Sequence, residues 1–167
     1  MDCDTAPRQE ETSLPMRAHD NAFVDAMRAA RAACENLCKR NTGCAQKESC
    51  QYYEKKLVGT TTYDPATDRW TSTQTSSGEC HCTGDLKIDC DTSIEQTVVN
   101  FGANHDTVVA DAQNYARTLA AGACTNKDCS APKKCKYKEK TPHGKTEPDA
   151  KWGWKSTQTS EGTCECT

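Results

Sequence analysis

Two stretches of the chain repeat apolar residues at the spacing of a helix. The first set is Phe23, Met27, Ala30, Cys34 and Leu37. The second set is Val108, Val109, Ala112, Tyr115, Ala116 and Leu119. Apolar residues that recur every three to four positions form one face of an amphipathic helix. Asp20 and Asp106 are the predicted N-caps, because a carboxylate can accept hydrogen bonds from the free amides of a first turn.

After each helical stretch the pattern changes to the alternation of a strand. Cys135, Tyr137 and Glu139 alternate with lysines between residues 134 and 140, and Cys50, Tyr52 and Glu54 keep the same phase. This alternation predicts a strand with cysteine and tyrosine inward. Second strands are expected to begin at Trp70 and Trp154. The segments 76–78 and 160–162 are predicted turns into short final strands that carry Cys80/Cys82 and Cys164/Cys166.

The segments before the two helices are predicted to differ from each other. Residues 6–18 are polar and contain Pro7 and Pro15, which indicates a loop. Thr92 to Glu95 instead resembles a capping box, and it predicts a short helix that ends near Gly102. Loops are also expected at 57–67 and 141–151.

The chain contains an internal repeat. Asp2–Thr5 recurs as Asp89–Thr92, His19-Asp20 as His105-Asp106, and Trp70–Thr83 as Trp154–Thr167. This repeat divides the chain into module 1 (residues 2–83), a linker (84–88) and module 2 (89–167). The predicted fold class is α+β, with two tandem disulfide-rich repeats, each a helix packed on a small antiparallel three-stranded sheet. The modules are expected to form a pseudo-twofold pair within a monomer.

Twelve of the 13 cysteines form two equivalent sets of six. We expect the members of each set to form disulfides, since small modules with little apolar area need crosslinks. The sets are Cys3, Cys38, Cys44, Cys50, Cys80 and Cys82, and Cys90, Cys124, Cys129, Cys135, Cys164 and Cys166. Their pairing stays open. Zinc bound by Cys44, Cys50, Cys80 and Cys82, with His81 as a substitute, is the alternative.

Cys34 is the cysteine left over. Its place in the apolar stripe predicts a buried free thiol, and a dimer bridged through Cys34 is the alternative. Disulfides on this scale indicate an oxidising compartment, so we expect a secreted or periplasmic protein whose leader has been removed.

Composition narrows the classes of partner. Hydrophobic residues make up 35% of the chain, and the mean hydropathy is −0.87. The net charge is −3, which argues against nucleic-acid binding. No apolar run is long enough for a transmembrane segment. The partner is therefore expected to be a protein or polysaccharide surface, and no cofactor is expected.

Exposed aromatic and basic residues are the predicted ligand-binding residues. Trp152 and Trp154, with Trp70 at the corresponding position of module 1, offer rings that can stack on a sugar or a peptide, and packing of these rings in the core is the alternative. Lys136 and Lys138 belong to a row of lysines that could dock an acidic partner or only protect a sheet edge. The threonines within 72–76 and 156–160 are attributed to β-propensity on a solvated face, since an array for ice or glycan binding needs more rows.

These observations favour a non-enzymatic, disulfide-stabilised, two-module binding protein. A secreted effector, toxin or enzyme inhibitor is the alternative. A hydrolase or a metal-binding protein that uses His19/His105 or the cysteine clusters is a further alternative. Enzyme activity is uncertain and less favoured, because no sequence motif supplies a complete catalytic set.

Overall fold

The computed structural model describes residues 5–40, 50–82, 90–125, 127 and 134–167. The predicted linker and Cys3, Cys44 and Cys129 lie outside them. The elements, in chain order, are β1 (Arg8–Thr12), α1 (His19–Lys39), β2 (Gln51–Asp64), β3 (Arg69–His81), β4 (Thr92–Gly102), α2 (His105–Thr125), β5 (Cys135–Glu139), β6 (His143–Asp149) and β7 (Gly153–Cys166).

All these strands belong to one sheet. It is seven-stranded in the order β1-β3-β2-β4-β7-β5, with β6 also paired to β7. The β2–β4 pair is parallel and the other pairs are antiparallel. The predicted fold class is therefore wrong: the halves do not form separate three-stranded sheets, but merge where β2 meets β4.

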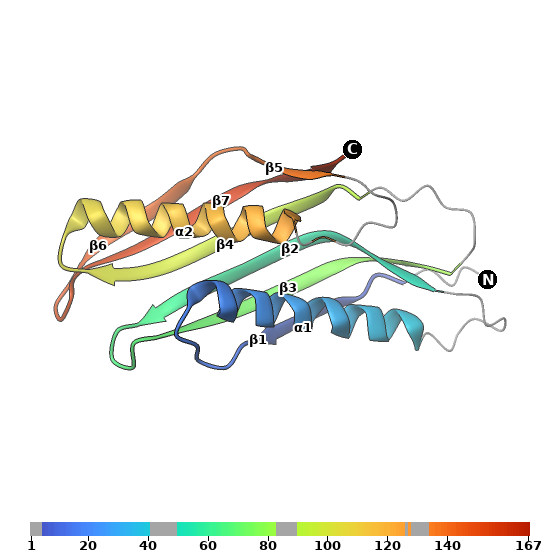
Figure 1. The fold of residues 1–167 in the computed structure, drawn as a ribbon, viewed down its shortest axis with the longest axis horizontal. Helices are drawn as coiled ribbons and strands as arrows, with labels where there is room; N and C mark the ends of the chain where they lie inside the picture. Colours follow the sequence, from blue (N-terminus) through green and yellow to red (C-terminus); the bar gives the residue numbers. More distant parts are fainter. Residues whose placement is uncertain (1–4, 41–49, 83–89, 126, 128–133) are drawn as a thin grey trace.

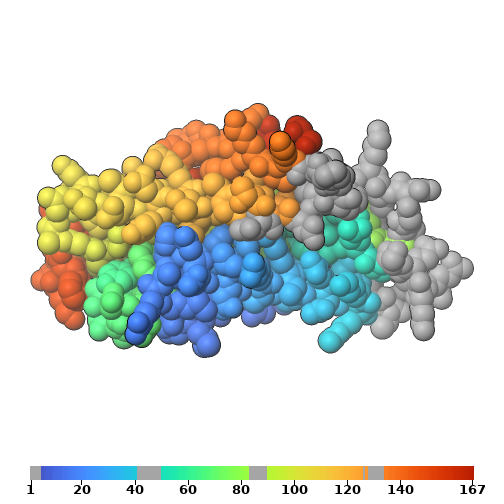
Figure 2. All heavy atoms as spheres, in the orientation of Figure 1, coloured from blue at the N-terminus to red at the C-terminus, as the bar shows by residue number. Residues whose placement is uncertain are grey.

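One apolar core explains why the sheets merge. It contains Phe23 and Leu57 of the first half together with Ile94, Val98 and Leu119 of the second. With so few apolar residues, neither half alone buries enough surface, and joining the strands excludes water from both. Figure 1 shows α1 and α2 side by side on one face of the sheet, running in the same direction. In Figure 2 the atoms of α1 (blue) lie beside those of α2 (yellow to orange).

The halves contribute elements in the same order, namely a strand, a helix and two antiparallel strands. In the second half the first strand of the hairpin is divided into β5 and β6. Because β2 and β4 are parallel and both helices cover the same face, the halves are related by a displacement along the sheet. The pseudo-twofold arrangement predicted from the sequence is therefore wrong.

Four local predictions also fail. Residues 92–102 form the strand β4 and not a helix, because their even-numbered side chains, including Ile94 and Val98, are buried alternately in the core. The predicted turns at 76–78 and 160–162 lie within β3, which continues to His81, and within β7, which continues to Cys166. The predicted loops at 57–67 and 141–151 lie largely in β2 and β6, and the polar segment 6–18 contains β1. Burial in the shared sheet outweighs these local turn and capping signals.

Both helices occur where the apolar stripes predicted them, but not with the predicted caps. Helix α1 begins at His19 and α2 at His105, so Asp20 and Asp106 lie inside the first turns. At α2, Asn104 Oδ1 accepts a hydrogen bond from the Thr107 amide at 3.1 Å, which is the geometry of an N-cap. Leu37, predicted in the buried stripe, is 48% exposed.

Candidate functional site

A row of threonines crosses the face of the sheet opposite the helices. Side chains of β3 alternate, so the buried Gln74 and Ser76 point toward the helices and Thr73 points to the other face. Strand pairing places threonines beside one another on five strands. This threonine row consists, in spatial order, of Thr12, Thr73, Thr60, Thr97 and Thr159.

Hydroxyl groups link members of the row. The Oγ1 atoms of Thr12 and Thr73 lie 2.9 Å apart, and those of Thr97 and Thr159 lie 2.8 Å apart. The next row toward the hairpin turns is also uncharged over four strands and consists of Thr71, Thr62, Val99 and Thr157. Neighbouring strands lie about 4.8 Å apart and alternate residues about 7 Å apart, so the two rows form a regular array of hydroxyl and methyl groups.

Charges border this array on three sides, since Lys145 on β6 lies opposite Thr157. Glu10, Glu95 and Glu161 lie in the adjacent row toward the cysteines. The opposite border carries both signs, because Arg69 pairs with Asp64 and Lys155 pairs with Glu147. The open face therefore has an uncharged centre with an acidic margin on one side and a margin of mixed charge on the other, which resembles the core and rim of an interface.

A second candidate lies beneath α1, where a charged pair is buried. Arg31 donates to both carboxylate oxygens of Glu54, from Nε at 2.9 Å and from Nη2 at 2.7 Å. The Ser76 hydroxyl donates to Glu54 Oε2 at 2.6 Å, and its oxygen lies 2.8 Å from the Tyr52 hydroxyl. We call these four residues the buried Arg–Glu cluster. Its hydrogen bonds satisfy a carboxylate that burial would otherwise make costly.

Cys34 lies against this cluster. Its thiol is fully buried and donates to the Ser76 carbonyl at 3.3 Å. Burial, which disfavours the thiolate, raises the pKa of Cys34, and burial likewise raises the pKa of Tyr52. A thiolate nucleophile needs the opposite environment, and a thiol enclosed in this way cannot bridge two copies unless the helix opens.

The second half contains a matching cluster in an open setting. Arg117 donates to Glu139 at 3.1 and 3.0 Å, and Glu139 accepts from Ser160 at 2.7 Å. Tyr137 Oη lies 2.9 Å from Ser160 Oγ. The Arg117 side chain is 43% exposed, whereas that of Arg31 is 16% exposed. The first cluster is less exposed because the end of α2 lies beside it, where Arg31 also donates to the Ala123 carbonyl at 3.2 Å.

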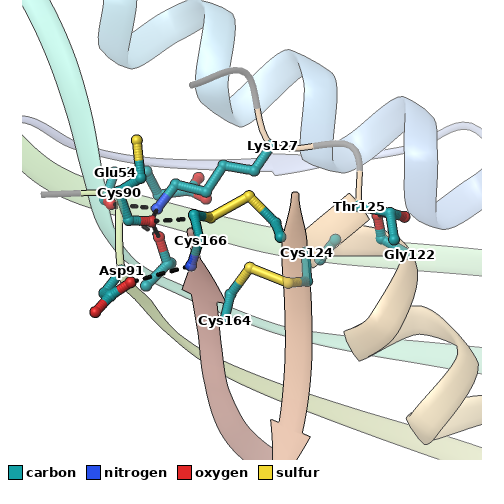
Figure 3. The surroundings of a disulfide bond; sticks show 12 residues. Glu54, Cys90, Asp91, Gly122, Cys124, Thr125, Lys127, Cys164 and Cys166 are labelled. Carbon is teal, nitrogen blue, oxygen red and sulfur yellow. Dashed lines mark hydrogen bonds between the residues drawn. A yellow bond between two sulfur atoms is a disulfide. The ribbon is translucent and has the colours of Figure 1, made fainter. Parts of the chain in front are cut away.

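Lys127 also connects the halves. Its ammonium donates to the backbone carbonyls of Cys90 and of Glu54, the latter at 3.3 Å (Figure 3). Burial, only partly offset by the Glu54 charge, lowers the pKa of Lys127 to about 8. The side chain therefore links the end of α2 to β2 at the boundary of the two halves.

Stability should consequently rise with pH as Lys127 loses its proton. The folded-state pKa of about 8 lies below the ordinary 10.5, so between these values the unfolded chain binds more protons. We expect the free energy of unfolding, relative to that of Lys127→Met, to increase by about 1–2 kcal/mol across this window after allowance for partial exposure. Urea unfolding at several pH values measures it. The exposed Lys136→Met serves as control. If the difference in free energy of unfolding between wild type and Lys127→Met stayed constant with pH, the lowered pKa of Lys127 would be contradicted.

Disulfide formation is confirmed for nine of the predicted cysteines, eight of which form the following four pairs. The pairs are Cys38–Cys80, Cys50–Cys82, Cys124–Cys164 and Cys135–Cys166. Cys90 is also disulfide-bonded. Cys80 and Cys82 thus receive bonds from the end of α1 and from the residue before β2, and Cys164 and Cys166 follow the same plan. Disulfides in this number are typical of extracellular or periplasmic proteins.

The sulfurs of these disulfides form two compact groups. Cys50, Cys80 and Cys82 lie within 4.8 Å of one another, as do Cys135, Cys164 and Cys166. In the oxidised protein each of these sulfurs belongs to a disulfide and is not a thiolate, which zinc requires. Of the zinc ligands considered from the sequence, His81 contacts Glu79 at 3.1 Å and stacks near Tyr53.

The predicted tryptophans lie in different environments. Trp70 is 9% exposed and packs against the rings of Tyr63 and Tyr115 in the core. Trp154 is half-buried beside His105, with ring centroids 4.8 Å apart. Trp152 is half-buried under the Lys151 ammonium. The structure therefore does not bring the three indoles together into one platform.

The predicted lysines are exposed on β5. Lys138 forms an ion pair with Glu165 on β7, and Lys136 pairs in register with the same residue. Both point away from Tyr137, whose hydroxyl reaches Ser160 on the helix side, so they lie on the open face of the sheet.

His19 and His105, the histidines considered from the sequence, each contact a tryptophan of their own half. His19 stacks on Trp70 and Tyr115, with centroid distances of 5.5 and 4.2 Å. Burial, partly offset by Asp20, lowers the pKa of His19. His105 packs edge-to-face against Trp154. In the described part of the chain neither belongs to a group of three or more side chains that could hold a metal ion.

The threonine row and the buried Arg–Glu cluster are the features that sequence reasoning missed. The pairs Arg31/Arg117, Tyr52/Tyr137 and Glu54/Glu139 were visible as residues kept between the repeats, but only the packing of helix on strand connects them. No family model, curated protein or solved structure significantly matches the chain. Within the described residues, neither helix is long and apolar enough to span a membrane.

Proposed function

We propose that this chain is a secreted or periplasmic, disulfide-stabilised binding protein that contacts a protein partner through the open face of its sheet. The observation that carries the proposal is the threonine row, with the adjacent uncharged row and the charged margins beside it. Threonine presents a methyl and a hydroxyl group with little side-chain freedom, so ordering it in an interface costs little entropy.

The shape and chemistry of this face favour a protein over a sugar or a small molecule. Small-molecule sites are concave and mostly apolar, whereas this surface is a sheet face. Sugar sites use exposed aromatic rings, and among the two threonine-containing rows the apolar member is Val99. An uncharged centre with charged margins of both signs instead fits a complementary protein surface.

Replacing Thr60 or Thr73 with lysine should strongly weaken partner binding and leave the fold intact. Both side chains lie on the open face, so a buried lysine ammonium in the interface would cost at least about 2 kcal/mol, or a roughly thirtyfold weaker complex. Thr107→Lys, on the exposed first turn of α2, makes the same chemical change on the helix side and serves as the control. Circular dichroism and melting temperature establish that all three variants are folded.

The binding assay uses the oxidised chain, immobilised and probed with panels of extracellular proteins, including secreted hydrolases scored for inhibition, and with polysaccharides. A protein partner lost with Thr60→Lys or Thr73→Lys but retained with Thr107→Lys supports the proposal. Binding that tolerates both open-face variants, or that is lost only with the helix-side variant, contradicts it. Binding confined to polysaccharides would assign the face to glycans.

A further inference from the structure

The contact between the two halves, which we call the joint, is of a kind that can repeat. The β2 edge of the first half meets the β4 edge of the second, in parallel and with both helices on the same side. Two different surfaces therefore meet. A head-to-tail contact of this type leaves one copy of each surface unused at the two ends, in contrast to a twofold contact, which uses the same surface twice.

Two glutamines and a glycine fix the joint. The amides of Gln74 on β3 and Gln96 on β4 donate to one another at 3.1 and 2.8 Å. The Gln74 side chain reaches Gln96 by crossing over Gly59 on the strand between them. A Cβ at Gly59 would lie 2.1 Å from Gln74 Oε1, so a side chain there would block the pair.

The outer edges of the chain carry the same three residues. On β6, Gly144 pairs with Gln158 as Gly59 pairs with Gln74, and a Cβ at Gly144 would lie 2.3 Å from Gln158 Oε1. On the opposite edge, Gln9 of β1 is paired with Ser76 as Gln96 is paired with Ser160. The β6 edge therefore presents Gly144 with the crossing side chain of Gln158. The β1 edge presents Gln9, which would form the hydrogen bonds that Gln96 forms in the joint.

We propose that copies of this chain associate head to tail, with β1 of one copy added in parallel to β6 of another, so that Gln9 lies opposite Gly144. This register copies the pairing of Gln96 with Gly59 in the joint. It places all of β1, Arg8–Thr12, opposite His143–Glu147, the first residues of β6. Glu10 then faces Lys145, a cross-strand pair of opposite charges.

Prolines mark the limits of the new pairing. In the same register Pro7 falls opposite Pro142, and Pro148 follows Glu147. Proline has no amide to donate, so pairing stops at these positions. The lysines of β5 likewise discourage continued addition along that edge. The contact is therefore short, and we expect reversible association that depends on concentration and weakens with salt.

Helix residues that are buried at the joint are exposed at the matching outer surfaces. Ala123 is fully buried at the joint, while Leu37, at the same position of α1, is 48% exposed. Arg117 is also more exposed than Arg31, which donates to the Ala123 carbonyl. Two copies arranged as the two halves are arranged at the joint would bring α1 of one copy beside α2 of the other. This contact would cover Leu37 of the first copy and bring its carbonyl to Arg117 of the second.

Charge reversal in solution tests the proposal. Sedimentation velocity of the full oxidised chain, from micromolar to near-millimolar concentration, should show a mass that rises with concentration. Glu10→Lys and Lys145→Glu should each weaken association about tenfold, because an attractive cross-strand pair becomes repulsive. An equimolar mixture of the two variants should associate again, since each mixed contact joins opposite charges. Glu35→Lys and Arg28→Glu, exposed on α1, are the controls for net charge.

Each outcome of this experiment decides the proposal. A monomer over the whole concentration range overturns it, and so does association that neither charge reversal weakens. A dimer that grows no further and is not restored by mixing would point to a twofold contact and would also overturn it. Partner binding through the threonine row is measured separately, with Thr60→Lys, so either proposal can fail while the other stands.

Discussion

Replacing Glu54 with alanine is expected to reduce the free energy of unfolding by about 3–5 kcal/mol, since it leaves the Arg31 charge buried without its carboxylate. Glu54 is 6% exposed and accepts hydrogen bonds from Arg31 and Ser76. Chemical denaturation with urea, followed by tryptophan fluorescence, measures the effect.

The matching cluster provides a control with the same chemistry. Glu139→Ala breaks the equivalent pair, in which the side chain of Glu139 is 25% exposed and that of Arg117 is 43% exposed. Because partly hydrated ion pairs contribute only about 0–1 kcal/mol, the free energy of unfolding should fall by no more than this amount. Equal losses for the two variants would contradict the assignment of the larger effect to burial. Restoring most of the stability of Glu54→Ala by adding Arg31→Met would support it, because the second change removes the uncompensated charge.

Removing the Cys38–Cys80 disulfide as the double alanine variant is expected to cost about 4 kcal/mol, the entropy of closing a loop of this length in the unfolded chain. The two residues are separated by 42 positions and tie the last turn of α1 to the end of β3. Both sulfurs are buried, so alanine introduces no unsatisfied polar group. Thermal and urea unfolding without reductant measure the loss.

The second half again offers the comparison. Cys124–Cys164 closes a loop of nearly the same length, 40 positions, and its removal should cost a similar amount. Cys34→Ala should cost about 1 kcal/mol, because it removes one buried sulfur and no crosslink. If Cys34→Ala proved as destabilising as the double variant, packing and not crosslinking would account for the effect.

The sequence predicted best those features that depend on local pattern. Stripes such as Phe23, Met27 and Ala30 recur at helical spacing, and this periodicity is the same in any context, so both helices could be located. Cys135 and Tyr137 alternate with lysines, and the strand and its inward face followed. The even sets of cysteines predicted oxidation, but their pairing required the end of α1 and the strand ends to be brought together in space.

Features that depend on long-range burial could not be predicted. Thr92 and Glu95 resemble the start of a helix, but Ile94 and Val98 form part of the shared core, and their burial fixes this segment as a strand. The threonine row required the order and register of five strands, because each half supplies only part of it. For the same reason Arg31 and Glu54 were visible as repeated residues but not as a buried pair.

By itself, the sequence determined the duplicated arrangement of helix and cysteines, since these features follow from spacing along the chain. Only the tertiary structure decided that the two halves share one sheet, which residues of the matching clusters are buried, and which edges stay open. The physical reason is the scarcity of apolar residues. Each half has too little surface to form a core of its own, so the β2 and β4 edges pair, and this pairing sets the environment of every candidate site.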